Sequence, residues 1–166
     1  MKLEELFDRY GEIMYQYLAL RLGSTADAED VLQETFCRLA RYSGRWAFIG
    51  NPRAYIYKVL RNEFNRYLKR RMIRNRIEQA VFNEPETGES AAAGRTDHGY
   101  DSQPSAIIAR ALDELPDEQK EVIVLKVYQD FSFREIAAVC GISTATAASR
   151  YRYGMDKLRS RLEGKA

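Results

Sequence analysis

Residues suited to metal binding, disulfide formation or histidine-based catalysis are scarce in this 166-residue sequence. The only histidine, His98, lies in a polar stretch, and the two cysteines, Cys37 and Cys140, stand apart from each other within apolar helical patterns. Without a CxxC pair or a Cys/His cluster, the sequence offers no zinc site and no disulfide framework. We expect reduced core cysteines, no metal, no cofactor and no histidine-dependent catalytic centre.

Long apolar runs are also missing. No segment reaches the roughly 20 apolar residues that a membrane-spanning helix needs. The N-terminal stretch MKLEELFDRYGEIMYQYL mixes charged and apolar residues, unlike an export signal. The hydrophobic fraction of 45% is enough to bury one or two small cores. These features predict a soluble, unexported, cytoplasmic protein.

Charge is distributed unevenly along the chain, although the net charge is only +2. Residues 51–78 carry a net charge of +7 and residues 132–166 a net charge of +4, whereas residues 79–104 carry −4. Basic blocks are usually solvated faces, but two of them in one chain favour a nucleic-acid partner.

Apolar residues recur at helical spacing over most of the sequence, which predicts an all-α fold. Helices are expected over residues 3–22, after a cap at Ser24 or Thr25, and over residues 53–77 as one long helix or two with a soft joint. Residues 79–104 hold three of the ten glycines and two of the four prolines, which predicts a flexible acidic linker that serves as a passive tether. Helical spacing resumes at residue 105, with Asp117 expected to cap a helix and Asp113, Glu114 and Glu118 expected away from any DNA-facing end.

Residues 131–158 have the pattern of a helix-turn-helix. Ile136 and Cys140 form an apolar stripe, Gly141 ends the first helix, and Ser143 can cap the second. Small polar residues followed by arginine then face outward, as a DNA major groove requires. An ordinary helical hairpin with a solvated basic face remains the alternative. The outward residues are Ser143, Thr144, Thr146, Ser149, Arg150, Arg152 and Tyr153.

Two further segments allow a structural and a functional interpretation. Asp30, Gln33 and Glu34 fall on the outer side or border of the helix that follows Ser24, where they serve a partner or simply complement the helix dipole. In the loop over residues 41–52, Trp46 and Phe48 either cover a core or offer stacking platforms for bases.

The basic helix after Pro52 carries eight cations within nineteen residues. Like charges at this density repel one another, so a polyanion that neutralises them is the expected partner. Tyr55, Tyr57 and Tyr67 interleave with the cations, as in proteins that bind single strands. The cations are Lys58, Arg61, Arg66, Lys69, Arg70, Arg71, Arg74 and Arg76.

Three segments resemble conserved regions of the extracytoplasmic-function (ECF) sigma factors, small bacterial transcription initiation factors of the sigma-70 family. DAEDVLQETF (27–36) resembles region 2.2, YIYKVLRNEFNRYLKRR (55–71) resembles the −10-reading helix, and LDELPDEQKEVIVLKVYQDFSFREIA (112–137) resembles region 4. The resemblance implies two small helical domains: a region 2 domain over residues 1–78 and a region 4 domain over residues 105–166, joined by the linker. It implies a non-enzymatic protein that binds core RNA polymerase and directs it to −10 and −35 promoter elements, under the control of a separate anti-sigma factor.

The resemblance also assigns residues. It implies polymerase contacts at Asp27, Asp30, Gln33 and Glu34. For the −10 element it implies contacts at Trp46, Phe48, Tyr55, Lys58, Arg61, Asn62, Arg66, Lys69 and Arg70, with the aromatic loop capturing a flipped base. The −35 contacts are the outward residues of the helix-turn-helix named above. The chain departs from the family at Arg66, where Asp is common, and at Ala148, where Lys is common.

Three rival functions make different demands on the sequence. A DNA-binding regulator that is not a sigma subunit would explain residues 131–158 but not the 27–36 helix or the cation run. A site-specific recombinase would need a catalytic Arg/His or acidic cluster, and none occurs before the linker. An adaptor that sequesters an anti-sigma factor should lack an intact DNA-reading surface, yet both basic surfaces are present.

Overall fold

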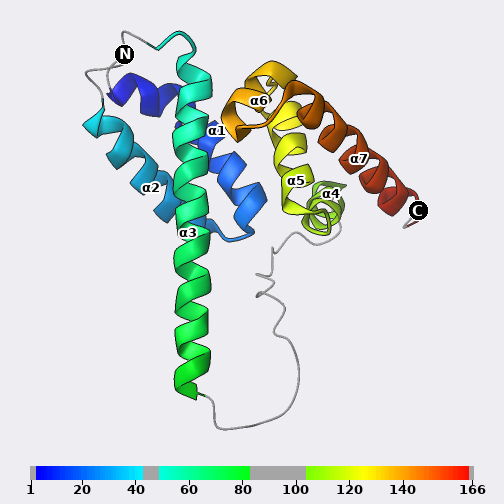
Figure 1. Cartoon of the computed structure of the whole chain (residues 1–166), viewed down its shortest axis with the longest axis horizontal. Helices are drawn as coiled ribbons and strands as arrows, with labels where there is room; N and C mark the ends of the chain where they lie inside the picture. The colour runs from blue at the N-terminus through cyan, green and yellow to red at the C-terminus, as the bar shows by residue number, and fades with distance from the viewer. Residues whose placement is uncertain (1–2, 43–48, 83–103, 165–166) are drawn as a thin grey trace.

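The computed structural model describes residues 3–42, 49–82 and 104–164, and all regular elements in these ranges are helices (Figure 1). The all-α fold class is therefore confirmed. In chain order the elements are α1 (Leu3–Leu22), α2 (Thr25–Arg41), α3 (Pro52–Phe82), α4 (Pro104–Asp113), α5 (Asp117–Ile123), the π-helix η2 (Val124–Tyr128), α6 (Phe133–Cys140) and α7 (Thr144–Glu163).

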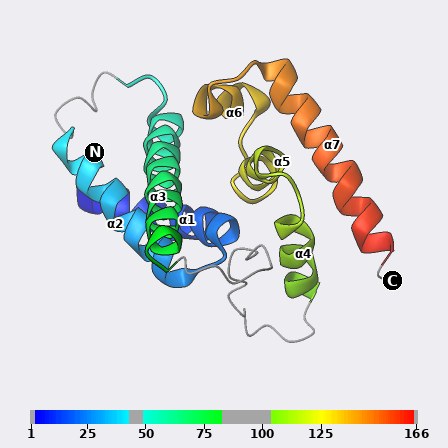
Figure 2. The same cartoon turned by 60° about the horizontal axis from the view of Figure 1, so that its bottom comes forward.

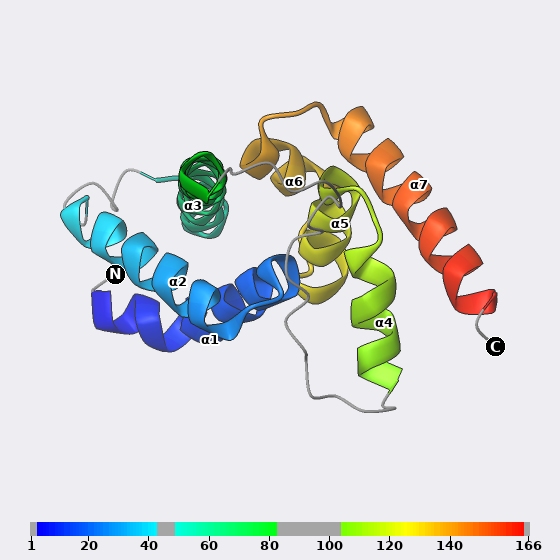
Figure 3. The same ribbon diagram turned by 90° about the horizontal axis from the view of Figure 1, so that it is seen from below.

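The first three helices form one group in which α1 and α2 pack side by side and α3 crosses them (Figure 3). The Ser24 hydroxyl accepts a hydrogen bond from the Asp27 amide (3.3 Å), so Ser24 is the cap of α2. The open question about the basic helix is resolved, because α3 is one continuous helix of 31 residues. Its C-terminal end extends past the other helices (Figure 1).

The helix-turn-helix is confirmed. Ser132 and Glu135 form a capping box at the start of α6, and Gly141 ends that helix in the left-handed conformation (φ 68°). The Ser143 hydroxyl accepts from the Thr146 amide (3.0 Å) and caps α7. The expected cap at Asp117 is wrong, because Pro116 precedes α5 without a side-chain cap and the Asp117 carboxylate instead pairs with an arginine of α1.

Close contact between α5 and α7 depends on a buried glycine. A Cβ at Gly154 would lie 2.8 Å from Ile123 Cδ1 and 3.2 Å from Gln119 Cβ, closer than van der Waals contact allows. Gly154 therefore lets the second helix of the helix-turn-helix approach α5. A small apolar cluster of Ala111, Leu112, Leu115, Ile123 and Leu158 holds α4, α5 and α7 together.

The two groups of helices pack against each other, as Figures 1 and 2 show. A single buried core runs from α1, α2 and α3 into α5, η2 and α6, and α3 lies directly against α6. At the centre of this contact, the Tyr57 ring of α3 meets Tyr17 and Phe131 edge-on, with centroids 5.6 and 4.9 Å away. Among the described helices, none combines the length and the apolar character needed to cross a membrane.

Candidate nucleic-acid and polymerase interfaces

The predicted −35 face lies at the surface along the first half of α7. Ser143, Thr144 and Thr146 are exposed at its start, and Arg152 and Tyr153 are exposed two turns further on, with the guanidinium 5.0 Å from the Tyr153 ring centroid. Such a face, polar at the helix start and cationic beyond it, can enter a major groove.

Two residues of the predicted −35 face are less available. Ser149 and Arg150 are half-buried, and Arg150 Nη2 lies 2.8 Å from Glu118 Oε2 of α5. The expectation that Glu118 lies away from this end of the domain is therefore wrong. Since the Glu118 side chain is 68% exposed, the pair is a weak surface ion pair that DNA can displace.

The predicted −10 face follows α3. Lys58, Asn62, Arg66 and Lys69, at steps of three or four residues, are all exposed, as is Arg70. Four cations and one amide are thus exposed along α3, a surface whose charge suits a strand of nucleic acid. The loop residues Trp46 and Phe48 lie outside the described residues.

Two other −10 candidates are engaged within the protein. Arg61 Nε lies 2.8 Å from Glu121 Oε1 of α5, and Tyr55 is half-buried against the core. Tyr57, which the sequence pattern groups with stacking aromatics, is fully buried. In the conformation described, Arg61 and Tyr57 contact the other helix group, and Tyr55 packs against the core.

The predicted polymerase residues are exposed on α2. Asp30, Gln33 and Glu34 face solvent, whereas Asp27 is half-buried and its Oδ2 lies 3.8 Å from Arg71 Nη1. Burial raises the pKa of Tyr67, and its hydrogen bond to Asp27 raises that pKa further.

A groove of about 250 Å³ lies between this acidic face of α2 and residues 63–74 of the basic helix α3. Sequence reasoning assigned α2 to polymerase and Arg70 to DNA, yet both line the same groove. Its charged walls, acidic on α2 and basic on α3, suit a partner that carries both signs of charge. The groove is lined by Asp30, Val31, Gln33, Glu34, Glu63, Tyr67, Arg70, Arg71 and Arg74.

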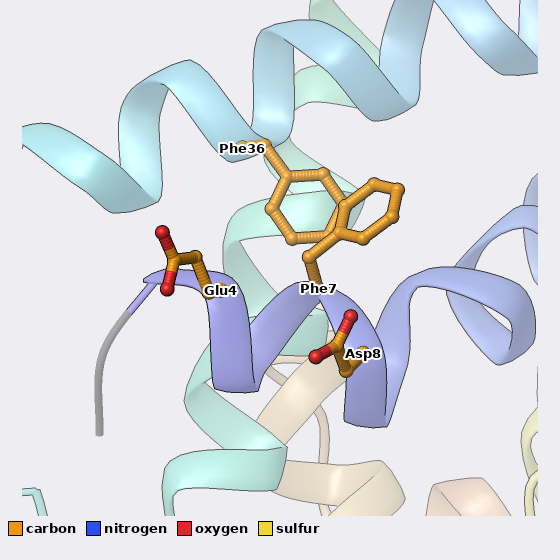
Figure 4. A pocket seen from close by; sticks show the side chains of 4 residues that line it. All are labelled: Glu4, Phe7, Asp8 and Phe36. Atoms are coloured by element: carbon orange, nitrogen blue, oxygen red, sulfur yellow. The ribbon is translucent and has the colours of Figure 1, made fainter.

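A second, apolar hollow of about 260 Å³ lies between α1 and α2 (Figure 4). It is lined by Phe7 and Phe36, whose ring centroids lie 5.1 Å apart, and by the acidic residues Glu4 and Asp8. The periodicity of α1 places Phe7 on the buried face, but its side chain is 57% exposed. Helical spacing alone does not show where a helix extends beyond the elements that cover it.

A buried charge cluster joins the two helix groups, and sequence reasoning missed it. Glu121 Oε1 accepts hydrogen bonds from Tyr17 OH (3.0 Å), Arg21 Nη1 (2.9 Å) and Arg61 Nε (2.8 Å). Burial raises the pKa of Tyr17 well above its ordinary value. Burial alone would lower the pKa of Arg21, but its phenolic and acidic neighbours raise it above the ordinary value. The guanidinium is thus charged while buried.

The fold and the two basic faces define a helical DNA-binding protein with a helix-turn-helix in its second helix group. Comparison with protein families refines this class. The family model of sigma-70 region 2 matches residues 6–74, and that of sigma-70 region 4 matches residues 105–158. The matched ranges coincide with the two helix groups.

Similar proteins narrow the class further. The chain is 32% identical to the ECF RNA polymerase sigma factor SigE of Mycolicibacterium smegmatis over 96% of its own length and 61% of the relative's. It is 31% identical to the ECF sigma factor SigL of Mycobacterium tuberculosis over 97% of its own length and 89% of the relative's. The chain belongs to the ECF sigma factors of the sigma-70 family. It is accordingly a transcription initiation factor and not an enzyme.

Solved structures share the fold. The sigma factor RpoE of Bartonella quintana, solved with the anti-sigma factor NepR, matches with a TM-score of 0.75 at 24% identity, covering 96% of this chain and 95% of that one. CnrH, solved with the cytosolic domain of CnrY, matches with a TM-score of 0.69 at 24% identity, covering 99% and 89%.

Proposed function

We propose that this sigma factor binds core RNA polymerase through the outer face of α2 and reads promoter DNA with α3 and α7. The proposal rests on one observation: different helices expose side chains of different charge. Acidic and amide side chains are exposed on α2, whereas cations and small polar groups are exposed along α3 and at the start of α7.

The polymerase contact rests on Asp30, Gln33 and Glu34, with Asp27 at the border. These side chains project from a helix whose opposite face is fixed by Val31 and Leu39 in the core, so they are presented on a rigid support. Charged groups on such a face steer and orient a cationic partner surface.

The −35 contact is made by α7 and the −10 contact by α3. On α7 the exposed hydroxyls near the helix start suit base edges and phosphates, and Arg150 and Arg152 supply bidentate donors. On α3 the row from Lys58 to Arg70 tracks a strand, with Asn62 offering both a donor and an acceptor to a base. The roles of Trp46 and Phe48 in capturing a base stay predictions.

The division of labour follows the two helix groups, with residues 1–78 for polymerase and −10, residues 105–166 for −35, and residues 79–104 as the connection. The helical part of α3 extends four residues beyond the first of these limits. Since transcription takes place there, we place the protein in the bacterial cytoplasm. The sigma factor RpoE was solved with the anti-sigma factor NepR, which supports an anti-sigma factor as a regulator here.

Charge reversal on α2 tests the polymerase assignment. Asp30→Lys should weaken association with purified core polymerase by about tenfold or more, because like charges then oppose each other at the contact. Glu163→Lys, the same reversal at an exposed position near the end of α7, is the control and should bind as the wild type does. Equal binding by both variants, at unchanged helicity, would remove α2 from the interface.

A further inference from the structure

The last part of α3, residues 69–82, is largely exposed, and we call it the α3 tail. Leu68 is the last apolar side chain of α3 that packs on the core. Every residue from 72 to 82 is exposed, and this end of the helix extends past the other helices (Figure 1). A partner surface can therefore reach the α3 tail from outside the two helix groups.

Large apolar side chains are exposed along the α3 tail. Ile73, Ile77 and Val81 follow one another at steps of four residues, so they form an apolar stripe about 12 Å long on one side of the helix. Together with Met72 and Phe82, these side chains are between 57% and 83% exposed. Folded proteins rarely leave several large apolar side chains in water unless a partner covers them. The apolar stripe therefore indicates a binding surface.

The α3 tail is also strongly basic. Five cations and one acid, Glu78, give it a net charge of +4. Helical spacing places Arg74 on one side of the apolar stripe and Arg76 on the other, with Asn75 and Gln79 on the opposite face. An apolar stripe with cations beside it and polar residues behind it is typical of a helix at the boundary between water and an apolar layer. The cations are Lys69, Arg70, Arg71, Arg74 and Arg76.

This combination of charge and apolar surface distinguishes between classes of partner. A nucleic acid would neutralise the cations but would leave the apolar stripe in water. A second copy of the chain would bring a tail of the same +4 charge against this one, and like charges repel. An anionic lipid surface offers both features that the tail requires, since it has acyl chains for the stripe and phosphate groups for the arginines.

We propose that the α3 tail is an amphipathic anchor for membranes that contain anionic lipids. The apolar stripe lies at the boundary between the head groups and the acyl chains, and Arg74 and Arg76 bond to lipid phosphates on either side of it. The helix lies in the plane of the surface and does not cross the bilayer. The inference goes beyond the proposed function and does not depend on it.

Vesicle flotation with the full-length chain tests the inference. One set of vesicles contains phosphatidylglycerol and phosphatidylethanolamine and is anionic, and the other contains phosphatidylcholine alone and has no net charge. We expect the chain to float with the anionic vesicles and to stay behind with the neutral ones. Raising the salt concentration from about 0.1 M to about 1 M should weaken the binding, because the Debye length falls from about 10 Å to about 3 Å.

Two double variants separate the apolar contribution from the electrostatic one. Ile73→Ser with Ile77→Ser keeps every charge and should lower the affinity for anionic vesicles by about tenfold or more, because two apolar side chains no longer leave water. Arg74→Gln with Arg76→Gln keeps the apolar stripe and should lower the affinity by about 25-fold, because each arginine near an anionic surface contributes about fivefold. All four side chains are exposed, so both variants should keep the wild-type circular dichroism.

Matched controls make the same chemical changes elsewhere on the surface. Ile107→Ser with Ile108→Ser removes two exposed apolar side chains from α4. Arg134→Gln with Arg159→Gln removes two exposed cations, one from α6 and one from α7. Both control variants should float with the anionic vesicles as the wild type does. Equal losses in the tail variants and the controls would overturn the assignment to the α3 tail.

The other outcomes also contradict the anchor. A wild-type chain that does not float with anionic vesicles would overturn it. Full flotation of the Ile73→Ser, Ile77→Ser variant would show that the vesicles only attract cations and that the stripe does not enter the lipid. If the wild type ignores vesicles but dimerises in sedimentation velocity, and these two serines abolish the dimer, the stripe is an interface between copies of the chain. If the serines instead weaken only the binding of DNA, the stripe belongs to a nucleic-acid interface.

Discussion

Replacing Gly154 by alanine sets two effects of similar size against each other. In the interior of a helix, Gly→Ala normally stabilises a protein by about 1 kcal/mol. At this position, however, the new Cβ would meet Ile123 Cδ1 at 2.8 Å and Gln119 Cβ at 3.2 Å. Ile123 is 1% exposed and has no room to move aside, and the Gln119 Cβ is fixed to the α5 backbone. Overpacking of this kind costs about 1–3 kcal/mol, so we expect net destabilisation.

The expected loss of about 1 kcal/mol corresponds to a decrease in Tm of roughly 2–4 °C for a chain of this size. Gly11→Ala is the matched control, because Gly11 also lies inside a long helix but its added Cβ meets Phe7 at an ordinary 3.7 Å. That variant should melt at a higher temperature than the wild type. Thermal unfolding followed by circular dichroism decides the matter: equal increases in Tm for both variants would refute the close approach of α7 to α5.

Four further predictions concern the two DNA-binding faces, the cysteines and the cap of α6. Arg150→Ala should weaken binding to a −35 duplex by about 1–3 kcal/mol and relax sequence preference at one position; a uniform loss over all sequences would make it a phosphate contact. Asn62→Ala should slow the appearance of permanganate-reactive thymines near −10 on duplex templates, and failure of a pre-melted template to restore activity would contradict its role at the melted strand. Burial raises the pKa of the Cys140 thiol to about 12, whereas Cys37 is exposed. A maleimide should therefore modify Cys37 before Cys140 in the native protein. Equal rates of modification at the two cysteines would contradict the burial of Cys140. The hydrogen bond from the Ser132 amide lowers the pKa of Glu135, so the ionised carboxylate stabilises the folded state. The loss in free energy of unfolding caused by Glu135→Ala should therefore be largest at neutral pH and should shrink as the pH falls below about 4.5. A loss that does not change with pH would contradict the capping box.

Local features of this fold could be predicted from the sequence. The caps at Ser24 and Ser143 and the helix end at Gly141 depend on a few neighbouring residues, and the structure confirms all three. Periodicity predicts the basic helix and its exposed row of cations, but it left open one long helix or two, and the structure shows a single helix. The exposed faces of α2 and α7 follow in the same way.

Features that depend on contacts between distant segments could not be predicted. Glu121 lies 100 residues from Arg21 and 60 from Arg61, and nothing in the local pattern of any of them indicates that they meet. The same is true of Gly154, whose role depends on the distance to α5. Asp117 looked like a helix cap because its local sequence allows one, but pairing with Arg21 determines its position.

Transcription by a reconstituted holoenzyme tests the central claim most directly. Purified core polymerase should produce a specific run-off transcript from a promoter with cognate −35 and −10 elements only when this chain is added. Asp30→Lys should need about tenfold more protein than the wild type to reach the half-maximal yield of that transcript. A chain that binds the promoter duplex and leaves core polymerase as inactive as before would contradict the account.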